Sequence, residues 1–142
     1  VRRVYEGTER SEHRNDDAWL YSNIGLEYLN AGRTDEGIRY LTEAEAERPD
    51  EADIQATLGA AFLMIGNDTD AIRYLETAIH LDSANPLTHS NLGFACLKTQ
   101  KFKDAEFHFR EALRLDPANG QAKQGLGIAS RLALQRPGSM TK

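Results

Sequence analysis

Residues 38–41 read Ile-Arg-Tyr-Leu, and residues 72–75 read Ile-Arg-Tyr-Leu again. The related sequence Glu106-Phe107-His108-Phe109 follows at the same spacing of 34 residues. A fixed period of this length, with apolar residues at helical spacing inside each unit, predicts a helical repeat array rather than one globular core. Each unit exposes an apolar face that only a stacked neighbour can cover, so we expect a curved stack with a groove open to a partner.

The composition is typical of a globular protein, since 40% of the 142 residues are hydrophobic and 27% are charged. The longest nearly apolar stretch, residues 58–65, is far shorter than the roughly 18 residues that a membrane helix needs. The N-terminal residues do not show the basic-then-apolar pattern of a signal peptide. The first residue is not Met, which fits a processed form or a fragment. We therefore expect a soluble protein without membrane insertion. The single cysteine, Cys96, demands no oxidising compartment, so the cytoplasm is the default, and a periplasmic or membrane-associated assembly stays open.

Charge is unevenly distributed along the chain. The net charge of −5 argues against nucleic acid as a partner, because phosphate binding is driven by Lys and Arg. Residues 18–85 carry thirteen Asp and Glu against four Arg, a net charge of −9, whereas residues 86–142 carry nine Lys and Arg against four acids, a net charge of +5. Such a dipole would orient a partner or promote head-to-tail self-association.

The period gives three units, residues 18–51, 52–85 and 86–119, which carry the same residue types at the same places. An apolar residue followed by glycine occurs at Ile24-Gly25, Leu58-Gly59, Leu92-Gly93 and Leu126-Gly127. The next large-residue place holds Tyr28, Phe62 and Cys96. Small residues recur later in each unit at Gly37, Ala71, Ala105, Ala44, Ala78 and Ala112. The units close with Pro49, Ser83 and Pro117.

This pattern, over about residues 16–135, resembles the tetratricopeptide repeat. The resemblance implies an all-α solenoid of helical hairpins, a right-handed superhelix with a concave groove. It divides the chain into a leader (1–15, a short helix or disordered), a repeat domain (16–135) that ends in a capping helix (120–135), and a tail (136–142).

Steric reasoning explains the small residues. In each unit a glycine lets the two helices approach closely and a large residue fills the space beside it; the glycines are Gly25, Gly59 and Gly93, and the large residues are Leu41, Leu75 and Phe109. Helices are expected at residues 17–30, 34–47, 51–64, 68–81, 85–98, 102–115 and 120–135.

Turn and cap residues separate these helices. Gly32 and Gly66 fit the left-handed position that ends a helix, and Thr34-Asp35 and Asp68-Thr69-Asp70 are expected to cap the following helices. Asn85-Pro86 predicts a cap followed by a first-turn proline. In the last helix we expect Leu126, Ala129, Leu132 and Ala133 to face the third repeat, and Lys123, Gln124, Arg131 and Gln135 to face water.

In the resembling family, the first helix of each unit lines the concave surface. The corresponding rows are Asn23, Thr57, Asn91 and Gly125, then Leu26, Ala60, Phe94 and Ile128, then Leu29, Leu63 and Leu97. Amides beside an apolar strip suit an extended peptide, because Asn both donates to and accepts from a peptide backbone. We expect nine of these residues to bind a peptide: Asn23, Leu26, Thr57, Ala60, Leu63, Asn91, Phe94, Leu97 and Ile128.

Asn23 and Asn91 also resemble the asparagine ladder in the repeat domain of O-linked N-acetylglucosamine transferases, where such residues hold a peptide backbone. The similarity lies in Ser22-Asn23-Ile24-Gly25 and Ser90-Asn91-Leu92-Gly93, and Thr57 interrupts the ladder. The alternative is that Asn is merely tolerated on a half-exposed helix face.

Repeat domains that clamp the terminal carboxylate of heat-shock chaperones use Lys, Asn and Arg on the same helices. The matching places here hold Ser22, Leu26, Thr57, Leu87 and Asn91. Without a cation a carboxylate would be desolvated with no charge-assisted partner, so we do not expect this clamp.

The sequence predicts no catalytic, cofactor or metal site, so we do not expect an enzyme. Cys96 replaces a large packed residue and is expected to be a buried packer. His13, His80, His89 and His108 have no metal-ligand spacing. Asp68-Thr69-Asp70 lacks the glycine and distal Glu of a calcium loop. Glu43, Glu45 and Glu47 spread over different faces of a helix and read as a solvated surface.

These observations favour a non-catalytic protein–protein interaction module that binds a peptide or helix of a partner protein. One alternative is the substrate-recruiting part of a larger enzyme such as a glycosyltransferase. A secretion or pilus-assembly chaperone or scaffold, and self-association, also stay open.

Overall fold

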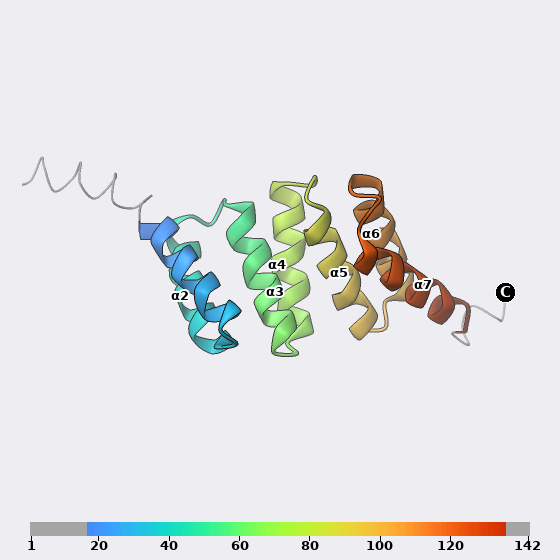
Figure 1. The fold of residues 1–142 in the computed structure, drawn as a ribbon, viewed down its shortest axis with the longest axis horizontal. Helices are drawn as coiled ribbons and strands as arrows, with labels where there is room; N and C mark the ends of the chain where they lie inside the picture. Colours follow the sequence, from blue (N-terminus) through green and yellow to red (C-terminus); the bar gives the residue numbers. More distant parts are fainter. Residues whose placement is uncertain (1–16, 136–142) are drawn as a thin grey trace, which may run out of the picture.

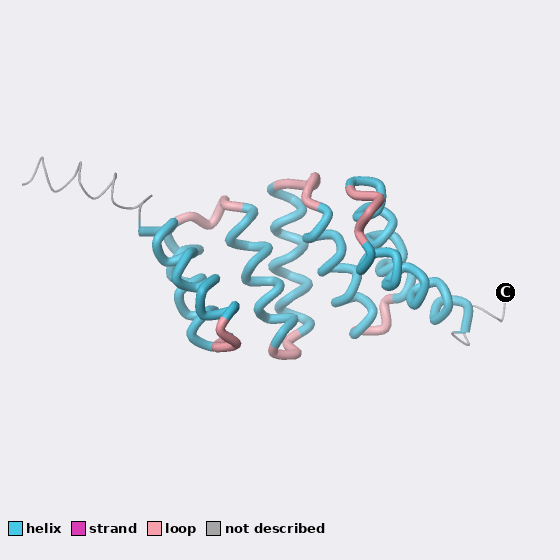
Figure 2. Tube along the Cα trace, in the orientation of Figure 1, coloured by secondary structure: helices cyan, strands magenta, loops and turns pink. Residues whose placement is uncertain are grey.

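The computed structural model describes residues 17–135, which fold into seven helices with no strand (Figures 1 and 2). The first helix covers residues 17–30. The other six are α2 (Thr34–Glu47), α3 (Ala52–Met64), α4 (Asp68–Leu81), α5 (Pro86–Lys98), α6 (Phe102–Leu115) and α7 (Gly120–Gln135). Two starts differ by one residue from the expected ranges, because Glu51 and Asn85 are the N-cap residues of α3 and α5.

Neighbouring helices pack side by side along the array, as Figure 1 shows from α2 to α7. The first helices of successive units also contact one another, since α3 touches α5 and α5 touches α7. Within residues 17–135, no such contact joins α2 to α4 or α4 to α6. Because the first helices lie closer together than the second helices, the array bends toward the side of the first helices.

Glycine in the first helix of a unit permits a close helix pair. A Cβ atom built at Gly59 would lie 2.5 Å from Cγ of Leu75, and one built at Gly25 would lie 2.7 Å from Cγ of Leu41. Both leucines are fully buried, as is Phe109, whose ring fills the same space beside Gly93. The expected pairing of small and large residues is therefore confirmed.

The turns inside the three units place one residue in the left-handed region. Gly32 has a φ angle of 78° and Gly66 one of 79°, as the sequence predicted. The equivalent residue of the third unit is Gln100, with a φ angle of 62°. A residue with a Cβ atom is strained in this region, so the third turn stores energy that the first two do not.

The helix caps differ in part from expectation. The N-cap of α4 is Asn67, whose side chain accepts a hydrogen bond from the Asp70 amide, rather than a residue of 68–70. The N-cap of α2 is Arg33, which makes no side-chain capping bond, so the cap expected at Thr34-Asp35 is wrong. Thr34 already lies inside the helix, and the acidic residues of its first turn act on the helix dipole instead. Asn85 caps α5 as expected, with its side chain accepting from the Leu87 amide.

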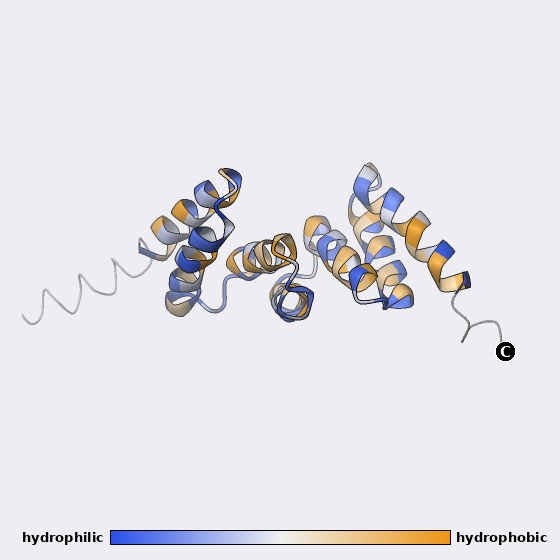
Figure 3. Cartoon of the chain, turned by 90° about the horizontal axis from the view of Figure 1, so that it is seen from below, coloured by the Kyte–Doolittle hydropathy of each residue, from blue (hydrophilic) through white to orange (hydrophobic). Residues whose placement is uncertain are grey.

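Two clusters of buried residues form the core. One contains Leu41, Ala44, Ile54 and Leu58; the other extends from Ala71 to Ala129. Phe62 packs against both clusters and joins them. Figure 3 shows hydrophobic and hydrophilic residues mixed along the array. The second helices α2, α4 and α6 are clearly amphipathic, whereas α3 and α5, which lie between neighbouring helices, are not. Between residues 17 and 135, no helix combines the length and the apolar character needed to cross a membrane.

Helix α7 covers the end of the stack as predicted. Ala129 is buried and Leu126 packs against the second core cluster. The residues that were expected to face water are exposed: Lys123, Gln124, Arg131 and Gln135. Gly127 occupies the glycine place of a first helix, but a Cβ atom there would meet no other group of residues 17–135 within 4 Å. The outer side of α7 is therefore open, unlike the same side of α3 and α5.

Candidate peptide-binding surface

We call the sides of helix 17–30, α3, α5 and α7 that carry Asn23, Thr57, Asn91 and Ile128 the candidate binding face. Asn23, Thr57 and Asn91 are each partly exposed. Gly125, the fourth member of this row, is buried, and a Cβ atom there would lie 2.3 Å from the ring of Phe109. The row of polar side chains therefore ends at α5.

The three polar residues differ in what they can offer a peptide. The amide groups of Asn23 and Asn91 make no hydrogen bond within residues 17–135. The hydroxyl of Thr57 donates to the carbonyl oxygen of Asp53 at 2.7 Å, so its proton is already used. Two of the three places thus retain both donor and acceptor capacity for a peptide backbone.

The apolar row beside them is partly available. Leu26 and Ile128 are 39% and 38% exposed. Ala60 and Phe94 are half-buried. The rings of Phe94 and Phe109 pack edge to face, with 4.9 Å between the ring centroids, so Phe94 also contributes to the core.

The third apolar row packs mainly inside the molecule. Leu63 and Leu97 are partly buried against the second core cluster, and Leu29 is partly buried against the first. These leucines are held between helices, so they offer a peptide less surface than Leu26 does.

A further row, which the sequence analysis did not select, lies one turn earlier on the same helices. Trp19 is 69% exposed and Leu87 is 62% exposed. Each precedes an asparagine, Asn23 or Asn91, by four residues, which places the two on one side of the helix. Asp53, which precedes Thr57 by four residues, is also exposed. The spacing of four residues before Asn23, Thr57 and Asn91 was the sequence signal that could have identified this row.

A pocket of about 440 Å³ lies between helix 17–30 and the start of α3. Trp19 and Asp53, from equivalent places in the first two units, both line it. The other lining residues are Ala18, Ser22, Arg48, Glu51 and Ile54. Because Trp19 continues the row of Asn23 and Leu26, the pocket adjoins the candidate binding face.

Two sequence profiles of the tetratricopeptide repeat match the chain, one over residues 23–86 and the other over residues 86–119. The chain belongs to the tetratricopeptide repeat family. No match is found among the curated protein sequences. The helical-hairpin solenoid expected from the sequence is thus confirmed.

Similar solved structures include tetratricopeptide repeat (TPR) domains from other proteins. The first TPR of Spaghetti (RPAP3), bound to the HSP90 peptide SRMEEVD, is 23% identical with a TM-score of 0.81, over 85% of this chain and 95% of that chain. The Arabidopsis OM64 TPR domain is 22% identical with a TM-score of 0.81, over 83% and 98%. MamA is 22% identical with a TM-score of 0.78, over 91% and 74%. At this level of identity the likeness concerns the fold.

The places matched to a carboxylate clamp carry no cation in this repeat domain. They hold Ser22, Leu26, Thr57, Leu87 and Asn91. The nearest cation further along α5 is Lys98, whose Nζ lies 3.2 Å from Oδ1 of Asp68 and 3.4 Å from the carbonyl oxygen of Leu63. Lys98 therefore ties α5 to the preceding hairpin.

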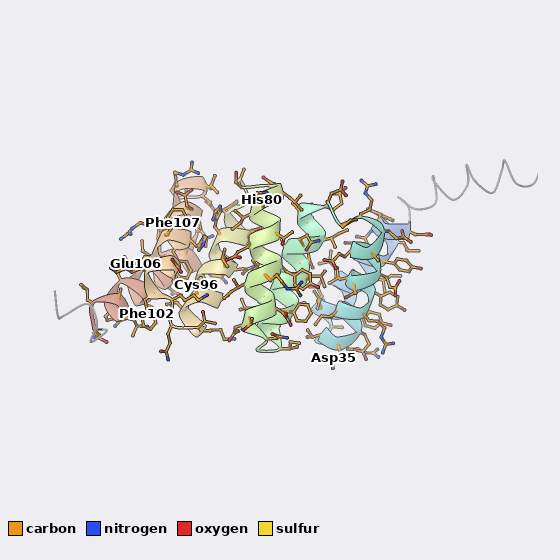
Figure 4. All side chains as sticks on the ribbon, turned by 180° about the vertical axis from the view of Figure 1, so that it is seen from behind. Asp35, His80, Cys96, Phe102, Glu106 and Phe107 are labelled. Atoms are coloured by element: carbon orange, nitrogen blue, oxygen red, sulfur yellow. The ribbon has the colours of Figure 1, made fainter. Side chains whose placement is uncertain are left out.

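The cysteine and the histidines were the candidates for catalysis or metal binding, and two of them, Cys96 and His89, are buried in the repeat array. Cys96 is buried, and desolvation raises the pKa of its thiol to about 11. His89 is buried and donates from Nε2 to the carbonyl oxygen of Ser83 at 3.0 Å, so it is a packed ring as expected. Figure 4 shows Cys96 and His80 on different helices. Within residues 17–135 no group of three or more His, Cys, Asp or Glu could hold a metal ion, and His13 lies outside the described residues.

Proposed function

We propose that this repeat domain is a non-catalytic module that binds a segment of a partner protein across the candidate binding face. The observation that carries the proposal is the pairing of amides and exposed apolar side chains on the same helix sides. Asn23 and Asn91 make no hydrogen bond within residues 17–135, and exposed Leu26 and Leu87 lie one turn away. Such a face would bury apolar surface and satisfy backbone groups of a guest at the same time.

The asparagine pair favours an extended peptide over a helix. The backbone groups of a helix already bond to one another, so an amide side chain would gain nothing from them. An extended segment presents free N–H and C=O groups, and Asn can pair with both. The apolar side chains Leu26 and Ile128 would then receive alternate side chains of the peptide.

The peptide-binding TPR domains among the similar structures support a role in protein interaction. One is bound to an HSP90 peptide and another to the HSP70 peptide SGPTIEEVD. We propose that this chain also binds a peptide, but by a different contact, because the matched clamp places carry no Lys or Arg. The partner would be a protein, with neither nucleic acid nor a membrane as ligand.

The test is affinity capture of the partner followed by titration with the double variant Asn23→Ala/Asn91→Ala. We expect binding to weaken more than tenfold while the helical circular dichroism spectrum is unchanged. Leu26→Glu should also abolish capture, whereas Leu134→Glu, at a leucine on α7 that is 75% exposed, should not. Phe94 is less suited to such a test, because its ring packs on Phe109. Undiminished affinity of the asparagine variant would remove the proposed backbone contact.

A second candidate role is the substrate-recruiting part of a larger enzyme such as a glycosyltransferase, or a secretion or pilus-assembly chaperone or scaffold. The open side of α7 at Gly127 favours it, because a helix from an adjoining domain would fit against that glycine. The length of the polypeptide in its native source tests this role. A native polypeptide of 142 residues that captures no further protein through α7 would remove it.

A further inference from the structure

The pocket between helix 17–30 and α3 is lined by an aromatic ring and a carboxylate, which indicate the kind of side chain that it binds. We propose that it binds a cationic side chain, Arg or Lys, of the peptide that lies on the candidate binding face. This inference rests on the proposed function and adds the charge of the guest. The pocket adjoins Asn23, so a peptide held there could place one side chain between Trp19 and Asp53.

The walls of the pocket supply two different attractions for a cation. The indole of Trp19 is 69% exposed, and an indole face is the strongest aromatic partner for a guanidinium or ammonium group. Asp53 lies on the α3 side of the pocket, and its carboxylate is exposed and makes no ion pair within residues 17–135. An arginine could therefore stack on Trp19 while it pairs with Asp53.

The other charged side chains that line the pocket within residues 17–135 are already engaged in an ion pair. Arg48 pairs with Glu51, with 2.6 Å between Nη2 and Oε1. Within residues 17–135, that ion pair offsets the charges of both residues, so Asp53 is the charged lining residue that has no ion pair of its own. An anionic guest would meet this carboxylate directly and would be repelled.

The electrostatic field of the first two repeats also favours a cation in the pocket. Residues 18–85 have a net charge of −9, so the first two repeats attract cations toward this end of the array. A bare metal ion is a poorer match, because calcium takes about six to eight oxygen ligands and magnesium about six. The pocket volume of about 440 Å³ is also far larger than an ion needs and suits an extended side chain with its neighbours.

Trp19 makes the test direct, because it is the only tryptophan of the chain. The 142-residue protein is titrated with acetyl-Gly-Leu-Ser-Arg-Ser-Leu-Gly-amide while the indole N–H resonance and the tryptophan fluorescence are followed. A second peptide carries citrulline, which has the shape of arginine without its charge. We expect the arginine peptide to shift the indole resonance and to bind at least fivefold more tightly than the citrulline peptide.

Substitutions separate the pocket from the rest of the face. Asp53→Asn should weaken the arginine peptide at least fivefold and remove its preference over citrulline. The control Glu43→Gln makes the same charge change at an exposed residue of α2 outside the pocket and should leave the affinity unchanged. Raising the salt concentration from about 0.05 to about 0.5 M should weaken the arginine peptide alone.

The outcomes distinguish this inference from the proposed function. Equal affinities for the two peptides, both weakened by Asn23→Ala/Asn91→Ala, would overturn the cation pocket and leave the binding face intact. The chain also carries Arg2, Arg3, Arg10 and Arg14. These four arginines are replaced by Gln, and the indole resonance is recorded without added peptide. If the resonance shifts, the cation in the pocket comes from the chain itself, and the proposal that a partner supplies it is overturned.

Discussion

Phe109 of α6 lies against two glycines at once, Gly93 of α5 and Gly125 of α7. A Cβ atom at Gly125 would lie 2.3 Å from Cζ of the ring, and one at Gly93 would lie 2.7 Å from Cε1. The ring is fully buried. One side chain therefore holds three helices together, and it does so only because two facing residues have no side chain.

Gly125→Ala should consequently destabilise the protein. Overpacking of a tight core typically costs about 1–3 kcal/mol, because neighbouring side chains must leave their rotamers. Gly127→Ala is the matched control on the same helix, since in the part of the chain that the structure describes a Cβ atom there meets nothing within 4 Å. It should stabilise by about 1 kcal/mol through helix propensity. Urea unfolding curves of the two variants should differ by at least ~2 kcal/mol; equal midpoints would contradict the packing around Phe109.

A second prediction concerns the strained turn of the third repeat. Gln100→Gly should stabilise the protein by about 0.5–1 kcal/mol, because glycine adopts the φ angle of 62° without steric cost. Gly32 and Gly66 already occupy the equivalent turns. Gln124→Gly, at an exposed position inside α7, should instead cost about 0.5–1 kcal/mol. Thermal unfolding measures both changes, and a loss of stability in Gln100→Gly would show that its side chain matters more than the backbone.

The repeat pattern was sufficient to predict the helices and their pairing. Glycines and alanines at a spacing of 34 residues mark places where two helices touch, and such contacts recur in every unit. The role of His89 was predicted only in part. Its place indicated a packed ring, but its bond to the Ser83 carbonyl, which repeats the bond from Gln55 to the Pro49 carbonyl, required the loop geometry.

The candidate binding face was harder to predict than the fold. Phe94 and Trp19 are both aromatic residues on the same side of a first helix, yet Phe94 is partly buried and Trp19 is 69% exposed. The difference arises from the neighbouring helices, since Phe94 meets Phe109 whereas Trp19 lies at the edge of a pocket. Helical periodicity gives the side of a helix that a residue occupies, but not how far the adjoining hairpin covers it.

A third prediction follows from the burial of Cys96. Desolvation, with a smaller contribution from Asp104, raises the pKa of its thiol to about 11, so little thiolate forms near neutral pH. Iodoacetamide should therefore react on the order of a hundredfold more slowly with the native protein at pH 8 than with the chain unfolded in guanidinium chloride. Mass spectrometry of the alkylated cysteine measures both rates. Equal rates would show that the third repeat opens readily.

The fourth prediction concerns the two histidines that join α5 and α6. Nδ1 of His89 lies 3.5 Å from Nδ1 of His108, and the Nε2 proton of His89 is donated to Ser83. Burial lowers the pKa of His108, with a smaller effect of the same sign from His89, while Asp104 and Glu111 oppose the shift. The unfolded chain therefore binds a proton at His108 at a higher pH than the folded chain does.

Stability should accordingly be complete above about pH 6.5, the ordinary histidine pKa, and should fall as the pH drops below it toward the lowered pKa of the folded state. His108→Gln should remove this part of the pH dependence, whereas His80→Gln, at an exposed histidine of α4, should retain it. Urea unfolding between about pH 5 and 8 measures the slopes. If His108→Gln and the parent chain lose stability equally on acidification, the histidine pair is not the group that senses the proton.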